Sequence, residues 1–180
     1  MANTQFDEFI KREKSRAAGA GNFDAKVSRE DWVSDVDALY KLVEKYMGPY
    51  IKRGDVKVSF GDIEINEELL GAYKIRRMNL AIGLQQVVFT PIGRIIIGAQ
   101  GRVDLMGPTG KKKLVRVDKD ATRPRISTSA FPDVLSISST PLSRPNTEIV
   151  WKFSTPPPSI QYLDLTEDSL MSSILEVANA

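Results

Sequence analysis

The chain has 180 residues, of which 42% are hydrophobic and 27% are charged, and it contains neither cysteine nor histidine. A chain of this length and composition can bury one hydrophobic core, so we expect a single domain. The missing residue types exclude disulfides, thiolate nucleophiles, Ser-His-Asp triads and most zinc sites. The sequence has no signal-like segment and no apolar run long enough to cross a membrane, so we expect a cytoplasmic protein without a membrane partner.

The charges are divided unevenly along the chain. Residues 1–70 carry 11 basic and 14 acidic side chains, residues 71–125 carry 12 and 3, and residues 126–180 carry 2 and 6. The net charge of +2 therefore conceals a strongly basic middle segment between two acidic ends. Two arrangements are compatible with this division: the acidic ends fold back over the middle segment, or a basic face stays exposed.

Two helices are predicted before the first strand. Thr4 is suited to cap a short helix that extends to about residue 16. Ser28 is suited to cap a second helix, in which apolar residues recur at helical spacing over 32–47. We expect Gly48 and Pro49 to end this helix, and its aromatic stripe to face the core.

Beyond Gly54 the apolar residues alternate with polar ones, which is typical of strands. The first five expected strands are 56–65, with a bend, bulge or turn at Gly61, then 71–82, 85–90 ended by Pro91, 93–106 and 112–118. Residues 131–138 and 148–154 are further candidates, and Thr166, after SIQYLDL at 159–165, is suited to cap a last helix over 167–179. Short connections between successive strands favour an antiparallel meander.

These elements predict an α+β fold with N-terminal helices, an antiparallel sheet of about six or seven strands, and a C-terminal helix packed on the sheet. Four segments make up the expected single domain: an N-terminal helix and linker (1–27), a helix and sheet (28–118), a Ser/Pro-rich loop or insertion (119–147), and strands with the last helix (148–180). A structureless segment as long as the third is usually functional or mobile.

The stretch GPTGKKK at 107–113 resembles a phosphate-binding loop but lacks its required residues. Leu105 stands where that loop needs its first glycine, and Lys112 stands where it needs Ser or Thr. A hairpin explains the stretch better, with Pro108, Thr109 and Gly110 as a three-residue loop. The expected register then pairs Val103 with Val115, Gly101 with Val117, and Arg102 with Arg116.

A group of basic residues follows this hairpin turn. It is open to two interpretations: a solvated charge network balanced by nearby aspartates, or a surface that meets phosphates or an acidic protein. No aromatic side chains are interleaved with it, so base stacking has no support. The candidate partner-binding residues are Lys111, Lys112, Lys113, Arg116, Lys119, Arg123 and Arg125.

The sequence predicts no catalytic residue and no cofactor. Asp62 and Glu64 project from one face of an expected strand, so they are weak candidates for binding a hard metal ion. A solvated acidic edge is the better explanation of the same two residues, and we therefore expect no metal site.

Several stretches resemble a family of small bacterial proteins of unknown function. They are YMGPYIKRG after the long helix, INEELLGAY, VVFTPIGRIIIGAQGRVDLMGPTG, KKLVRVD and the late YLDLTEDSLMSSIL, and they cover roughly 28–118 and 160–177. The resemblance implies a bacterial, cytoplasmic, single-domain α+β protein, and it transfers no active-site residues. Against this layout, residues 119–147 look like an insertion.

We therefore expect a non-catalytic binding or adaptor module of a bacterial assembly, which docks an acidic protein through the basic hairpin and the long loop. A DNA- or RNA-binding protein using the same basic residues is the first alternative. An enzyme that depends on carboxylates and a metal ion is the second. The sequence does not determine the oligomeric state.

Overall fold

The computed structural model describes residues 8, 24–96, 98–124 and 147–179. In chain order, the described elements are α2 (Ala25–Tyr46), α3 (Gly48–Arg53), β1 (Val56–Glu67), β2 (Gly71–Ile82), β3 (Gln85–Gly93), β4 (Arg102–Gly107), β5 (Gly110–Asp118), β6 (Ile149–Ser154), β7 (Tyr162–Asp164) and α4 (Glu167–Ala178). All seven strands form one sheet, in which each strand pairs with the next along the chain. The pairing is antiparallel throughout, which confirms the expected α+β meander with its C-terminal helix.

The long helix α2 begins earlier than predicted. Its N-cap is Asp24, whose carboxylate accepts hydrogen bonds from the backbone N–H groups of Lys26 and Val27, so Ser28 lies inside the helix and does not cap it. Aspartate is as good a cap as serine, and the sequence offered both within five positions. The helix ends at Tyr46 as expected, but Gly48 and Pro49 open the short helix α3, because proline is well suited to a first helical turn.

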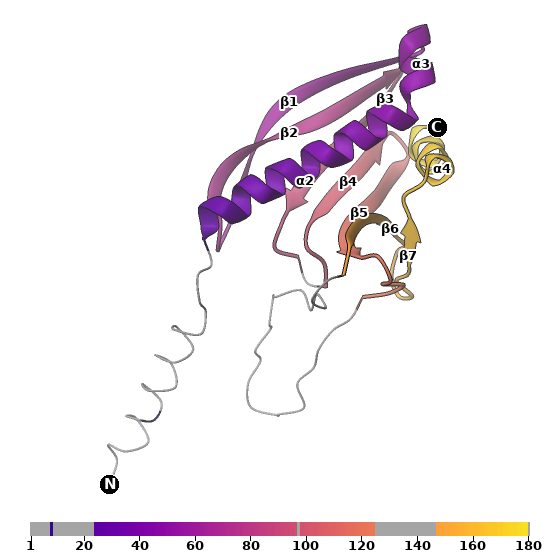
Figure 1. Ribbon diagram of the computed structural model, residues 1–180. Helices are drawn as coiled ribbons and strands as arrows, with labels where there is room; N and C mark the ends of the chain where they lie inside the picture. Colours follow the sequence, from indigo (N-terminus) through magenta and orange to yellow (C-terminus); the bar gives the residue numbers. More distant parts are fainter. Residues whose placement is uncertain (1–7, 9–23, 97, 125–146, 180) are drawn as a thin grey trace.

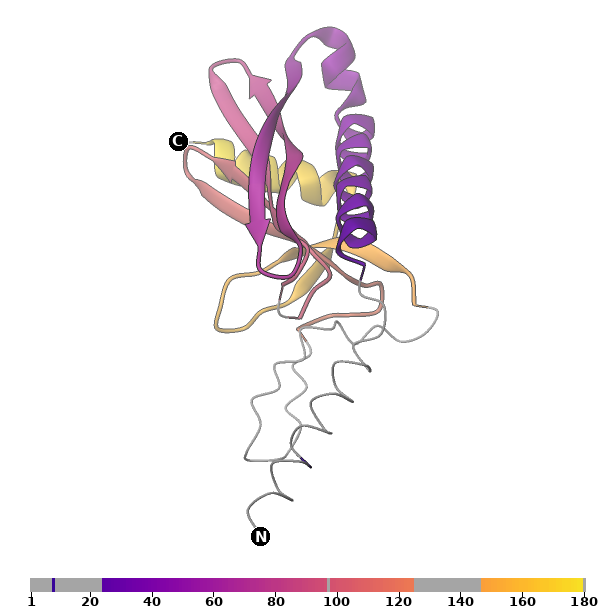
Figure 2. The same cartoon turned by 90° about the vertical axis from the view of Figure 1, so that its left-hand side faces the viewer.

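The β1–β2 ribbon is long and curved (Figure 1). Its pairing runs without interruption past Gly61, so the predicted irregularity there is a bend and not a hairpin turn. The buried residues of β2 include Ile75 and Met78, which are three positions apart, so the face that points to the core changes between them. Figure 2 shows the ribbon running beside α2, with α3 joining the two at one end.

The segment between β3 and β4 differs from the prediction. Residues 95, 96 and 98–100 are not part of β4; instead, Ile96 and Ala99 form an isolated bridge around a turn. Gly98 and Gly101 have φ angles of 78° and 150°, which turn the backbone where an unbroken strand was expected. Pro91 lies inside β3 and not beyond its end, next to an irregularity in the register with β4.

The β4–β5 hairpin is tighter by one residue than expected. Gly107 pairs with Gly110, so the loop consists of Pro108 and Thr109 alone. This register brings Val103 opposite Leu114, both of which are fully buried, and it leaves Arg102 opposite Val115. The predicted register, including its Arg102–Arg116 pair, is therefore wrong.

The C-terminal helix α4 begins where the sequence predicted. Thr166 caps it, and the side chain of Ser169 bonds back to the Thr166 backbone N–H, which completes a capping box. The other end of the helix meets the β4–β5 hairpin, because Thr109 donates hydrogen bonds to the carbonyl oxygens of Glu176 and Val177.

Both long helices cover the same face of the sheet. Trp32, Leu39 and other residues of α2 share one buried cluster with Leu170 and Ile174 of α4 and with the inward residues of β2 to β6. A smaller cluster, made by Val115 and Val117 with Ala99 and Ala121, lies on the opposite face of β5. We call the face covered by α2 and α4 the helix face and the opposite one the outer face.

Two predicted elements, the helix ending near residue 16 and the strand over 131–138, lie outside the described residues. Within the described residues, no helix is long and apolar enough to cross a membrane.

Candidate functional site

The predicted basic residues begin on the outer face of the β4–β5 hairpin. Lys111 and Lys113 point to this face because they alternate with the buried, inward-facing Leu114. Between them and β3 lies Asp104, which is only 2% exposed. Arg102 binds its carboxylate with two nitrogens, Nε to Oδ1 and Nη2 to Oδ2, both at 2.7 Å. The Lys111 Nζ is farther from Asp104 Oδ2, at 3.7 Å.

Apolar side chains lie beside these charges. Met106 and Ile92 are 37% and 38% exposed, and Val88, directly opposite Met106 in the register, is partly exposed. We call the surface formed by Val88, Ile92, Met106, Lys111 and Lys113 the outer patch. Its charge is positive, because Arg102 already neutralises the one buried aspartate beneath it.

The remaining predicted residues do not join the outer patch. Lys112 forms an ion pair with Glu176 of α4, and Arg116 forms one with Asp35 of α2, so both point to the helix face. Lys119 pairs with Glu148 at 2.7 Å. Arg123 is exposed and makes no ion pair with the described part of the chain, and Arg125 lies outside it. The structure thus divides the predicted basic cluster between two faces of β5.

A half-buried charge cluster lies between α2 and the sheet. Arg94 Nη1 is 3.2 Å from Asp35 Oδ2, and Arg116 Nη2 is 2.9 Å from Asp35 Oδ1. Burial raises the pKa of the Asp35 carboxyl, and the two guanidiniums offset part of that effect. Burial likewise lowers the pKa of the Arg116 guanidinium, and Asp35 opposes this shift. Perturbed groups of this kind mark candidate functional sites, although structural ion pairs also produce them.

Sequence reasoning singled out Arg116 but missed Asp35 and Arg94. Asp35 stands between the apolar positions Trp32 and Val36, so its side chain borders the core-facing stripe of α2. A charged residue at such a border is a signal for a partner on the sheet. Arg94 gave no comparable signal, because the sequence placed it inside an expected strand over 93–106, whereas in the structure it follows the end of β3 at Gly93.

Next to this cluster, Glu67 connects the tip of the β1–β2 ribbon to the end of β3. Its carboxylate accepts hydrogen bonds from the backbone N–H groups of Arg94 and Ile95, at 3.1 Å and 2.8 Å, and from the Tyr73 hydroxyl. Burial raises the pKa of Tyr73, and the bond to Glu67 raises it further. All of these donors are satisfied within the protein. The contact therefore fixes the end of the β1–β2 ribbon against the end of β3.

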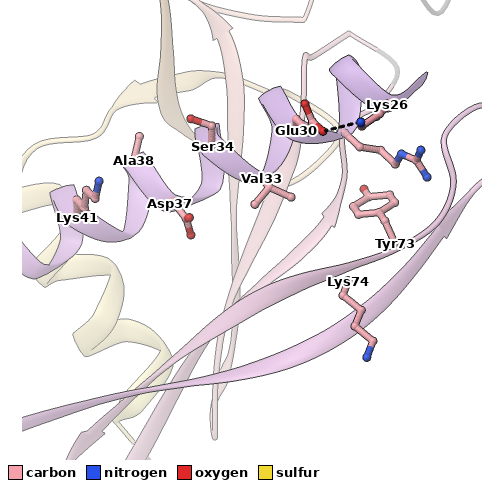
Figure 3. A pocket seen from close by; sticks show the side chains of 10 residues that line it. Lys26, Glu30, Val33, Ser34, Asp37, Ala38, Lys41, Tyr73 and Lys74 are labelled. Carbon is pink, nitrogen blue, oxygen red and sulfur yellow. Dashed lines mark ion pairs between the residues drawn. The ribbon is translucent and has the colours of Figure 1, made fainter. Parts of the chain in front are cut away.

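A groove of about 630 Å³ runs between α2 and β2 (Figure 3). Its two acidic residues are paired, Glu30 with Lys26 and Asp37 with Arg76. Lys41 and Lys74 lie far apart in it, and their side chains point in opposite directions (Figure 3). The groove therefore offers no convergent set of polar groups that would hold one small ligand.

The weak metal candidates, Asp62 and Glu64, are exposed on β1. In the register they stand opposite Arg76 and Lys74, which supply positive charge where a metal ion would have to bind. Across the described ranges, no three acidic side chains come together in a way that could hold a metal ion.

Comparison with known proteins identifies no relative. No family model matches the chain, and neither a curated protein nor a solved structure matches it. No family is therefore assigned, and a function has to be inferred from the surfaces described above.

Proposed function

We propose that this protein is a non-catalytic binding or adaptor module, and that it docks an acidic protein partner through the outer patch. One observation carries the proposal: exposed Met106 and Ile92 lie beside Lys111 and Lys113, on a sheet face that neither α2 nor α4 covers. An apolar centre with charged residues at its border is the usual anatomy of a protein interface.

The charges around the patch favour an acidic partner. Lys113 has no ion pair within the described residues, and Lys111 only approaches Asp104 at 3.7 Å, so both ammonium groups can bind carboxylates of a partner. Asp104 does not repel such a partner strongly, because Arg102 binds it through two nitrogens. The lysines would steer association, and the apolar residues would supply most of the affinity.

Nucleic acid is a less suitable occupant for the same surface. The patch has two lysines and no aromatic ring, whereas binding to a nucleic acid backbone usually requires many cations, and binding to single strands also uses stacking. The division of the predicted cations between two faces weakens this alternative further. Binding of nucleic acid to this surface would therefore contradict the proposal.

Site-specific photo-crosslinking in the native host tests the proposal. A photoreactive amino acid at position 106 should crosslink a protein that the same amino acid at Lys57 does not capture. The captured protein is then identified, purified and titrated against the unmodified chain. We expect Lys111→Glu combined with Lys113→Glu to weaken this binding at least about tenfold, because attraction becomes repulsion at two positions.

The matched control reverses two exposed lysines elsewhere, Lys52 and Lys57, which have no ion pair within the described residues. The control double variant has the same net charge as the Lys111/Lys113 double variant. A difference in binding between the two must therefore come from the positions of the substitutions. Equal binding by wild type and the Lys111/Lys113 variant would refute the proposal. Crosslinking of position 106 to nucleic acid, and not to protein, would also refute it.

A further inference from the structure

The Asp35 cluster has more cationic than anionic groups in direct contact. Two guanidiniums, from Arg94 and Arg116, share the single carboxylate of Asp35. Asp31, one turn earlier on α2, contributes to the local field, but it is exposed and makes no ion pair with the described residues. The site is therefore built around two arginines that one acid only partly compensates.

Within the described residues, much of the hydrogen-bonding capacity of these arginines is unused. A guanidinium has five N–H donors and can hold a carboxylate with two of them at once. Here Arg94 donates one hydrogen bond to Asp35, whereas Arg116 contacts Asp35 as an ion pair at 2.9 Å and donates a hydrogen bond to the side-chain oxygen of Gln100 at 3.3 Å. By contrast, Arg102 of the same protein binds the Asp104 carboxylate through two nitrogens.

The cluster is also accessible. The side chains of Asp35, Arg94 and Arg116 are 20%, 22% and 19% exposed, so solvent reaches all three while most of each is shielded. Partial burial strengthens an ionic contact relative to open water, and an anion here would meet two cations at once. These are the properties of a pre-formed oxyanion site.

We propose that Arg94 and Arg116 bind an oxyanion, a phosphate or carboxylate group of a ligand, and that Asp35 is their counter-ion when the ligand is absent. Asp35 holds the two guanidiniums side by side, but it also competes with the ligand for them. The site lies on the helix face, away from the outer patch, so it can bind its ligand without the protein partner proposed above.

This dual role of Asp35 gives a directional test. Inorganic phosphate and succinate serve as separate probes, each titrated into the full chain by calorimetry and by amide NMR at low ionic strength. We expect Asp35→Asn to tighten binding by about tenfold, because a neighbouring negative charge is removed while both arginines stay. Arg94→Gln and Arg116→Gln should each weaken binding by a similar factor.

A second ion pair on the same helix provides the matched control. Asp37 contacts Arg76 at 2.8 Å, and no second arginine from the described part of the chain joins them. Asp37→Asn and Arg76→Gln should therefore leave anion binding unchanged. Arg116→Lys keeps the positive charge, and it distinguishes lost binding from lost folding if Arg116→Gln proves unstable.

The outcomes separate the possible ligands from a purely structural cluster. Binding of phosphate alone would indicate a phosphorylated ligand, and binding of succinate alone would indicate a carboxylate ligand. The proposal is overturned if neither probe binds wild type or Asp35→Asn at millimolar concentration. An equal gain for Asp37→Asn would overturn it as well, because the effect would then be one of net charge.

Discussion

Two glycines that face each other across the β4–β5 hairpin should respond very differently to the same small substitution. A Cβ atom on Gly107 would lie 2.2 Å from the carbonyl oxygen of Val177 in α4, whereas one on Gly110 would meet nothing within 4 Å. The obstacle at Gly107 is backbone, which cannot rotate away. Gly107→Ala must therefore push the end of α4 away from the hairpin.

The cost can be estimated from what this movement breaks. Overpacking of a tight contact costs about 1–3 kcal/mol. Thr109 would also lose its hydrogen bonds to Glu176 and Val177, each worth about 1 kcal/mol. We expect Gly107→Ala to lower the free energy of unfolding by about 3–5 kcal/mol. Gly110→Ala should be neutral or stabilise the protein by about 0.5 kcal/mol.

Urea unfolding monitored by tryptophan fluorescence measures both variants on the same scale. Since each variant adds one methyl group at the same hairpin, differences in composition and helix propensity are negligible. Equal stability of the two variants would show that the end of α4 is not seated against Gly107, and the two-residue register of the hairpin would lose its support.

Two further substitutions test the packing around α2 and the burial of its tyrosine. Gly101→Ala should lower the free energy of unfolding by about 3–5 kcal/mol in the same assay. The φ angle at this position is 150°, and the new Cβ would lie 2.3 Å from the buried ring of Trp32. A loss of stability below about 1 kcal/mol would contradict this packing. Burial raises the pKa of Tyr40 and of Tyr73 above the ordinary value of 10.0. The unfolded chain therefore loses these protons first, and stability should fall as pH rises above about 10, by up to about 1.4 kcal/mol per pH unit for each tyrosine. Tyr40→Phe should reduce this slope, and an unchanged slope would be evidence against the burial of its hydroxyl.

The order and type of the elements could be predicted because they depend on local patterns. The apolar positions of α2 recur at helical spacing, those at the start of β1 alternate, and Thr166 has a serine three residues later to complete its capping box. Each of these signals lies within a few residues of sequence. The short connections then left the meander as the simplest topology.

The predictions were wrong where a contact between residues far apart in the sequence decides which of two local structures forms. A two-residue and a three-residue loop both suit the sequence around Pro108, and the register is decided by which face of β5 meets the helices. The run at 95–97 is apolar enough for a strand, yet the close approach of Trp32 to Gly101 helps fix a turn before β4. No local pattern contains this information.

The candidate sites were predictable only in part, for a related reason. The cluster of cations after the hairpin is visible in the sequence, but its division between two faces depends on the register of β5. Lys113 and Arg116 are separated by an odd number of positions, so a strand must place them on opposite faces. Asp35 and Arg94 are 59 residues apart, and only the packing of α2 on the sheet brings them together.

The uneven charge of the chain now has a physical explanation that combines the two arrangements first considered. On the helix face, acids from the ends of the chain fold back over the basic middle segment: Asp35 meets Arg94 and Arg116, and Glu176 meets Lys112. Around the hairpin on the outer face, Arg102 and Lys111 contact Asp104, which belongs to the middle segment itself; the acidic end meets Lys119 through Glu148 only beyond the end of β5. The acidic ends therefore compensate one face of β5 more fully than the other. The excess positive charge around the hairpin lies where exposed Met106 also lies, and this coincidence of free charge and free apolar surface favours a binding role over a purely solvated one.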